Sequence, residues 1–181
     1  MTQHVIEPSK LAQFQDLFLQ WNRRINLSAA RTPDEVDAHV RDSLEAVPHL
    51  AGSLRVIDVG SGGGFPVLIA ALALPALSFT ALEPIHKKHA FLRTAARELG
   101  LSNLEALAQR VEDHARHDYD AATSRATFDL REWLLLGARL VRPGGLVLGF
   151  EATPRDDLPA QLERHAYELD GKRRAIVLHR P

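Results

Sequence analysis

The chain has 181 residues, of which 45% are hydrophobic and 25% charged, a composition typical of one soluble globular domain and not of a disordered chain. It contains no cysteine, which excludes disulfide frameworks, thiolate metal sites and cysteine nucleophiles. The formal net charge of -1 combines 22 basic and 23 acidic residues, and such a total selects no class of partner. The N-terminus lacks the layout of a signal peptide and no apolar stretch is long enough to span a membrane, so we expect a cytoplasmic protein.

The first fifty or so residues are predicted to be helical. After Pro8, apolar side chains recur at helical spacing: Leu11, Phe14, Leu17, Phe18, Trp21 and Ile25. A second helix is expected to begin at Thr32, which can form a capping box with Glu35, and its apolar positions continue to Val47 and Leu50. We therefore expect residues 1–53 to form an N-terminal helical extension packed on the core of the molecule.

From residue 54 onward, strands alternate with helices. Strands are expected at 55–59, 78–82, 104–108, 120–123, 146–150, 166–169 and 175–178, and helices at 66–74, 87–99, 130–140 and 158–165. A turn is expected at residues 142–145, Arg-Pro-Gly-Gly. This order predicts an α/β core over residues 54–181, with a seven-stranded, mostly parallel sheet and helices on both faces. With the extension it makes a single domain.

A glycine-rich loop follows the first predicted strand, in the segment Val56-Ile57-Asp58-Val59-Gly60-Ser61-Gly62-Gly63-Gly64-Phe65-Pro66. This is the carboxyl edge of the sheet, where open α/β sheets bind ligands. The dinucleotide fingerprint G-x-G-x-x-G does not fit, because Phe65 or Val67 stands where the third glycine belongs, and no P-loop is present. The pattern Asp58-x-Gly60-x-Gly62-x-Gly64 resembles motif I of class I S-adenosylmethionine-dependent methyltransferases. That resemblance implies a Rossmann-like fold and S-adenosyl-L-methionine as cofactor.

Glu83 ends the second predicted strand, nineteen residues after Gly64. An acidic side chain at this place accepts hydrogen bonds from ribose hydroxyls. NAD enzymes share this feature, so Glu83 supports an adenosine ligand without choosing between the two cofactors.

Further motifs follow one another along the chain: Trp21-Asn22-x-x-Ile25-Asn26-Leu27-Ser28, His39-x-x-Asp42-Ser43, the glycine loop, and Ser124-Arg125-Ala126. Together they resemble the GidB/RsmG family, small-subunit ribosomal RNA methyltransferases that modify guanine at N7. The segment Gln109-Arg110-Val111-Glu112 is similar to the one that contacts the adenine in that family. The resemblance extends from Phe14 to the Arg173-Arg174 pair.

The resemblance implies a set of site residues. From the resemblance, the cofactor is expected to contact Gly60, Phe65, Val111, Glu112 and Arg125. The glycine loop and the acidic strand end add Asp58, Gly62, Gly64 and Glu83 to the expected cofactor site. Arg125 is also expected to reach into the active site as a positioning residue, although it could instead pair with Asp129. The target base is expected to enter between Arg125 and the region that bears Asn26 and His39. One departure from the family is Glu151, which stands where relatives usually carry a lysine.

The residue inventory also narrows the acceptor. Transfer to pyrimidine carbon 5 usually needs a cysteine, and transfer to exocyclic amines typically uses an Asp/Asn-Pro-Pro-aromatic loop, of which the chain has neither. Guanine N7 offers an in-plane lone pair without a proton, so positioning and electrostatics suffice. Together with the resemblance, this leads us to expect a monomeric enzyme, without metal or membrane attachment, that methylates N7 of a guanine in 16S ribosomal RNA or a small-subunit precursor. The alternatives are a catalytically weak relative that binds cofactor or RNA, and a small-molecule methyltransferase on the same fold.

Overall fold

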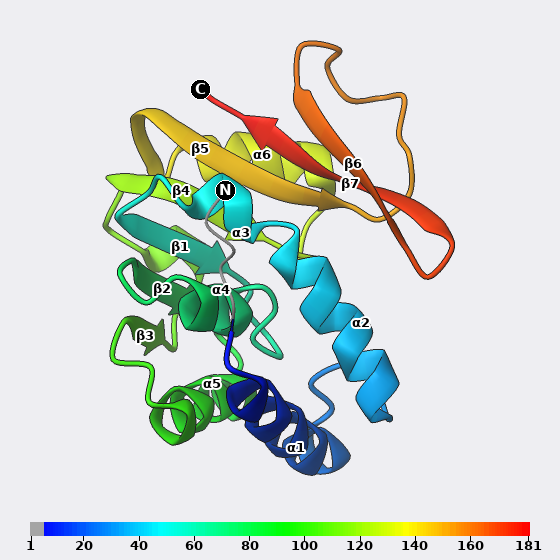
Figure 1. The fold of residues 1–181 in the computed structure, drawn as a ribbon. Coiled ribbons are helices and arrows are strands. Elements are labelled where there is room, and N and C mark those ends of the chain that lie inside the picture. The colour runs from blue at the N-terminus through cyan, green and yellow to red at the C-terminus, as the bar shows by residue number, and fades with distance from the viewer. Residues whose placement is uncertain (1–5) are drawn as a thin grey trace.

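The computed structural model describes residues 6–181 and contains one sheet of seven strands in the order β3-β2-β1-β4-β5-β7-β6 (Figure 1). The strands are β1 Arg55–Val59, β2 Ser78–Leu82, β3 Leu104–Leu107, β4 Tyr119–Ser124, β5 Val141–Glu151, β6 Glu163–Leu169 and β7 Lys172–His179. Strands β1 to β5 pair in parallel, whereas β7 runs antiparallel to both β5 and β6. The strand order reverses between β1 and β4, and ligands of open α/β sheets bind beside such a reversal.

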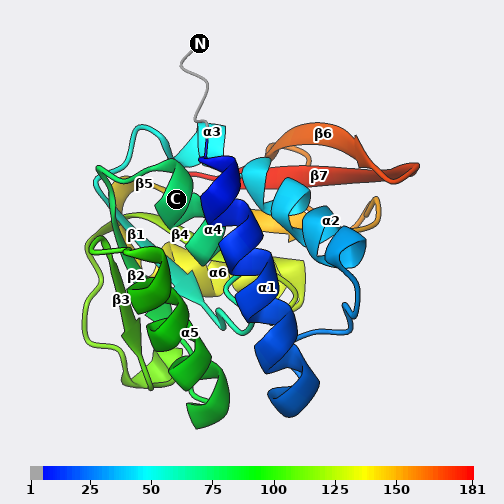
Figure 2. The ribbon, with the colours of Figure 1, turned by 60° about the horizontal axis from the view of Figure 1, so that its bottom comes forward.

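Helices cover both faces of the sheet, as the sequence predicts (Figure 2). They are α1 Pro8–Ile25, α2 Pro33–Leu44, α3 Val47–Leu50, α4 Val67–Ala73, α5 His86–Leu99 and α6 Leu130–Ala138. Alternate strand residues point to opposite faces, so Val56 joins a core shared with α1 to α5, while Ile57 joins a second core with α6. The predicted α/β fold is confirmed.

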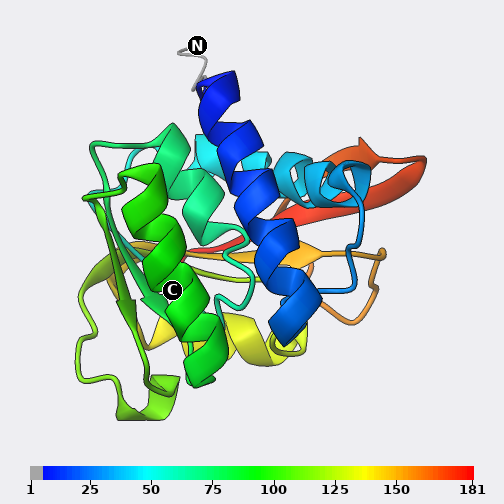
Figure 3. The ribbon, with the colours of Figure 1, turned by 90° about the horizontal axis from the view of Figure 1, so that it is seen from below.

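The helices that precede β1 share the main core of the molecule. Figure 3 shows α1 lying between α5 and α2. Phe14 and Phe18 of α1 are fully buried, and the Phe18 ring meets Phe91 of α5 at 6.0 Å between centroids. Burying one such ring contributes about 1.5–3 kcal/mol, so this contact holds α1 firmly against α5.

The structure corrects three local predictions. The second helix does not continue to Leu50 but breaks after Leu44 and restarts as α3, because Pro48 would clash with the carbonyl of residue 44 in a continuous helix. The helix predicted at 158–165 is wrong, since β6 already begins at Glu163 and pairs along its length with β7. The expected turn at residues 142–145 lies inside β5 as an irregularity in its pairing with β4.

Candidate active site

The glycine loop connects β1 to α4 and is held by backbone hydrogen bonds. The N–H groups of Gly60 and Ser61 donate to the carbonyl of Leu82 at 2.9 and 3.1 Å. Gly60, Gly62 and Gly64 adopt φ values of 71°, 49° and 83°, a region that glycine enters at no steric cost. A Cβ at Gly64 would also overlap the side chain of Leu68. The loop therefore needs glycine for both its backbone conformation and its packing.

Glu83 is buried beside this loop at the end of β2, with only 4% of its surface exposed. Its carboxylate accepts the N–H of Gly62 and the N–H of Ile85, each at 2.8 Å. These bonds fix the carboxylate against the glycine loop. Each carboxylate oxygen can accept more than one hydrogen bond, so Glu83 keeps capacity for the hydroxyls of a ligand.

Asp58 lies beneath the loop, inside β1, and is almost fully buried. One carboxylate oxygen accepts the Thr123 hydroxyl at 2.7 Å, whereas the other, Oδ2, has no hydrogen-bond partner. Burial raises the pKa of Asp58 to about 6, although the hydroxyls of Ser61 and Thr123 act in the opposite direction. Asp58 is thus an acidic group with an unsatisfied acceptor at the base of the loop.

Two hollows flank Gly60. The first, of about 290 Å³, is lined by Leu27, Ser28, Ala29, His39, Gly60, Ser61, Gly62, Gly63, Phe65, Lys88, Arg125, Ala126 and Thr127. The second, of about 180 Å³, is lined by Val59, Gly60, Leu82, Pro84, Gln109, Arg110, Val111, Glu112, Thr127 and Phe128. Because Gly60 and Thr127 border both hollows, an elongated ligand could cross from one to the other over the glycine loop.

The first hollow brings together several residues that the sequence predicts for the site. The Arg125 guanidinium lies over the Phe65 ring, 5.0 Å from its centroid, and donates to Asp42 at 2.9 Å. It also lies 3.3 Å from Nδ1 of His39. Burial, with the charge of Arg125 second, lowers the pKa of His39 to about 4. The His39 ring is therefore neutral near pH 7. The carboxylate that pairs with Arg125 is that of Asp42 and not that of Asp129.

Asp42 is the centre of a buried polar cluster that the sequence does not reveal. Its carboxylate accepts the Tyr167 hydroxyl at 2.7 Å and Arg174 Nη1 at 3.2 Å, in addition to Arg125. Burial, followed by the hydrogen bond to Asp42, raises the pKa of Tyr167. The cluster joins α2 to the segment after β4 and to strands β6 and β7, and so it fixes where Arg125 points.

Of the other residues predicted for the site, Val111 and Glu112 border a hollow and Asn26 does not. Val111 and Glu112 begin a short 3-10 helix and border the second hollow. Asn26 caps the end of α1 with a φ of 56°, and its side chain accepts Arg31 at 3.1 Å. It does not line the first hollow, although the residues just after it do. Its role toward the substrate stays a prediction.

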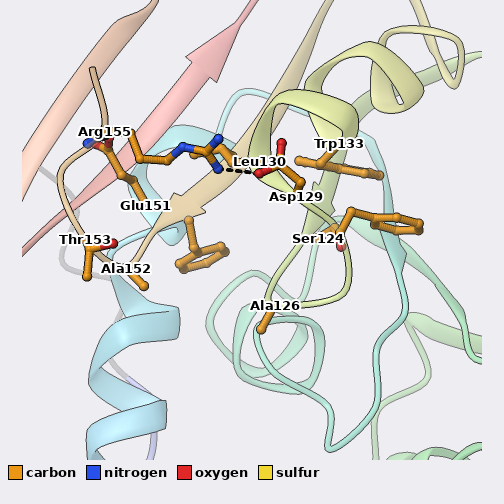
Figure 4. A pocket seen from close by; sticks show the side chains of 11 residues that line it. Ser124, Ala126, Asp129, Leu130, Trp133, Glu151, Ala152, Thr153 and Arg155 are labelled. Atoms are coloured by element: carbon orange, nitrogen blue, oxygen red, sulfur yellow. Dashed lines mark hydrogen bonds and ion pairs between the residues drawn. The ribbon is translucent and has the colours of Figure 1, made fainter. Parts of the chain in front are cut away.

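A third hollow, of about 270 Å³, lies between the ends of β4 and β5 (Figure 4). It is lined by Ser124, Ala126, Phe128, Asp129, Leu130, Trp133, Phe150, Glu151, Ala152, Thr153 and Arg155. Ala126 also borders the first hollow, and Phe128 also borders the second. The three hollows therefore adjoin around the segment after β4. In the sequence, the motif Ser124-Arg125-Ala126 and the unusual Glu151 pointed to this place.

Residues 7–177 match the model of the GidB family, which is described as "rRNA small subunit methyltransferase G". The chain belongs to this family. A relative with the same name from Aromatoleum aromaticum is 39% identical over 188 residues, covering 95% of this chain and 89% of the relative. Another from Myxococcus xanthus is 37% identical over 164 residues, covering 88% and 75% respectively. The resemblance to the GidB/RsmG family is thus confirmed.

Solved structures of methyltransferases share the fold. The O-methyltransferase TomG from Streptomyces achromogenes, in complex with SAM, has a TM-score of 0.64 at 15% identity, covering 96% of this chain and 90% of its own. A SAM-dependent methyltransferase from Aquifex aeolicus has a TM-score of 0.60 at 15% identity, covering 96% and 99%. Within residues 6–181 of our chain, no helix is long and apolar enough to cross a membrane, and no three His, Asp or Glu side chains are placed to hold a metal.

Proposed function

We propose that this GidB-family protein transfers a methyl group from S-adenosyl-L-methionine to N7 of a guanine in 16S ribosomal RNA. One observation carries the proposal: the segments that resemble the family along the sequence meet around the first two hollows. The glycine loop, His39 and Arg125 border one hollow, and the segment from Gln109 to Glu112 borders the other. Family membership over almost the whole chain supports the same conclusion.

The residues around Gly60 fit this cofactor. The second hollow has apolar walls from Val59, Leu82 and Val111, which suit a flat adenine ring. The Glu83 carboxylate accepts the N–H of Gly62 in the glycine loop, and from there it would hold the ribose hydroxyls. The unsatisfied oxygen of Asp58 is an acceptor for a positively charged amino group at the base of the loop.

The chemistry asks little of the protein beyond placement. When bound, S-adenosyl-L-methionine supplies a methyl group attached to a positively charged sulfur. Guanine N7 carries a lone pair and no proton, so the site needs no general base. The Asp42 cluster holds Arg125 in one position, and the neutral His39 ring packs beside Phe65 at 5.2 Å between centroids. These residues border the first hollow, where they would hold the methyl-donor end of the cofactor so that the methyl group faces the acceptor in line.

The test uses purified protein, small ribosomal subunits from cells that lack the gene, and S-adenosyl-L-methionine with a labelled methyl group. We expect the label in 16S ribosomal RNA, and after digestion in a nucleoside that comigrates with 7-methylguanosine. Gly62→Asp should abolish the transfer, because an aspartate at a φ of 49° would place its side chain near the Glu83 carboxylate. Label in a free metabolite with the RNA untouched would support the small-molecule alternative, and binding without transfer would support the catalytically weak one.

A further inference from the structure

The third hollow has the position expected for an acceptor pocket. It opens between the ends of β4 and β5 and touches both cofactor hollows, through Ala126 on one side and Phe128 on the other. Enzymes that modify a base draw it out of its stack into a close-fitting pocket lined by aromatic and polar groups. Here Phe128 and Phe150 supply ring surfaces, and Phe128 is itself stacked on Trp133 at 5.9 Å.

Glu151 places a buried carboxylate in the wall of this hollow. It ends β5 and has only 5% of its surface exposed. Oε1 accepts the backbone N–H of Arg155 at 2.9 Å and lies 3.4 Å from Arg164 Nη2. These two contacts hold the carboxylate in place and both use Oε1, so the acceptor capacity of Oε2 is free for a ligand. A buried carboxylate is costly unless donors surround it.

We propose that this hollow holds the acceptor guanine and that Glu151 recognises its N1–H and its N2 amino group. The assignment rests on the proposed function. Guanine presents these two donors side by side, and Oε2, whose two lone pairs are both unused, can accept them together, whereas adenine presents an acceptor at N1 and would be repelled. N7 lies on the opposite edge of guanine. With its donor edge on Glu151, the base therefore turns N7 away from β5, toward Ala126 and the cofactor hollows.

Figure 4 shows that Glu151 and Arg155 come from one side of the hollow, and Ser124, Ala126 and Asp129 from the other. Arg155 pairs with Asp129 across the rim. The base would lie between these two sides, and the Arg155 guanidinium would stand where the backbone of an extruded nucleotide passes. The glutamate that departs from the family pattern thereby gains a role in choosing the base.

The experiment compares two RNA substrates that differ by one amino group. Small subunits are reconstituted with 16S ribosomal RNA ligated to carry either guanosine or inosine at the mapped target; inosine keeps N7, O6 and N1–H but lacks the N2 amino group. For the wild type we expect kcat/KM to be about 10- to 100-fold lower on inosine, because one charge-assisted hydrogen bond is lost. This comparison needs no variant of the protein.

Glu151→Gln then assigns the effect to the side chain. We expect kcat/KM on guanosine to fall about 10- to 100-fold, and the guanosine-to-inosine ratio to shrink to about twofold or less. Affinity for S-adenosylhomocysteine, measured by calorimetry, should not change. The matched control is Glu168→Gln, an exposed glutamate on β6, which should keep both the wild-type rate and the wild-type ratio.

The outcomes separate the two proposals. If the wild type methylates inosine as well as guanosine, or if Glu151→Gln keeps the full ratio, the assignment of the pocket is overturned and the proposed function stands. If the wild type transfers nothing to the guanosine substrate, the proposed function itself is overturned, and the assignment with it. A reduced ratio in Glu151→Gln with unchanged cofactor affinity supports both.

Discussion

The glycines after β1 are required for different reasons. Gly62 places its N–H on the Glu83 carboxylate while in a left-handed conformation. Gly64 combines a φ of 83° with a position against Leu68 that leaves no room for a Cβ. Gly52, by contrast, has open space around it. The same substitution, glycine to alanine, should therefore change the stability of the protein by different amounts at these positions.

Gly64→Ala should lower the free energy of unfolding by about 2–4 kcal/mol, the sum of a left-handed alanine and of overpacking. It should also weaken cofactor binding, since the loop must shift to relieve the overlap with Leu68. Urea denaturation measures the first effect and calorimetry the second. Gly52→Ala is the control and should change stability by no more than about 0.5 kcal/mol. Equal effects of the two substitutions would refute the packing argument.

Glu83→Ala tests the ribose contact. Removing a carboxylate that accepts hydrogen bonds from a ligand should reduce affinity for S-adenosylhomocysteine by roughly 10- to 100-fold. Part of this loss would come from the loop, because Gly62 and Ile85 lose their acceptor, so the melting temperature must be measured as well. Glu105→Ala, at an exposed position on β3, should leave the affinity unchanged. An unaltered affinity in Glu83→Ala would remove Glu83 from the site.

His39 gives stability a pH dependence whose sign follows from its pKa. The folded protein holds the pKa of His39 at about 4, whereas the usual value, which the unfolded chain keeps, is 6.5. Between these values the unfolded chain binds a proton that the folded protein refuses, so His39 makes the free energy of unfolding fall as the pH drops from 6.5 to 4. In His39→Asn this contribution should disappear. The difference in free energy of unfolding between the wild type and the variant should therefore change between pH 4 and pH 6.5. If urea denaturation gave the same dependence of the free energy of unfolding on pH for both proteins, this role of His39 would be contradicted.

Elements formed by local patterns are predictable here, and elements formed by distant pairing are not. The strand at Arg55–Val59 is bounded by turn signals and its predicted limits match the structure. The apolar spacing after Leu158 suggests a helix, yet pairing with β7 draws Glu163–Leu169 into β6. The same holds for the site. The glycine loop can be read from its motif, but nothing near Asp42 announces partners more than a hundred residues away.

The Asp42 cluster links α2 to the antiparallel strands β6 and β7, so the packing of α2 depends on these two strands. Asp42→Asn would leave Arg125 and Arg174 without a charged partner in a buried position, so we expect a loss of about 3 kcal/mol in the free energy of unfolding. The rate of methyl transfer should fall by more than the loss of folded protein explains, because Arg125 loses its fixed orientation. Asp37→Asn, on the same helix in an exposed pair with Arg41, is the control and should have no measurable effect. If both variants unfold at the wild-type urea concentration, the cluster does not join these elements.

At the scale of the whole molecule, the net charge of -1 hides an uneven distribution around the site. Lys88 and Arg125 border the first hollow, Arg110 the second and Arg155 the third. The first hollow has no acidic residue in its lining, whereas Glu112 borders the second, and Asp129 and Glu151 border the third. The excess of cations is confined to the first hollow, where it suits a substrate made of RNA, and the sum of charges could not show it.

The central claim is that this protein places the methyl group of 7-methylguanosine in 16S ribosomal RNA. The most direct measurement is mass spectrometry of nucleosides and RNA fragments from cells with the gene, without it, and with the gene restored as wild type or Glu83→Ala. We predict one 7-methylguanosine in 16S ribosomal RNA that vanishes without the gene, returns with the wild type and returns weakly or not at all with Glu83→Ala. Identical modification of that RNA in all four strains would contradict the account.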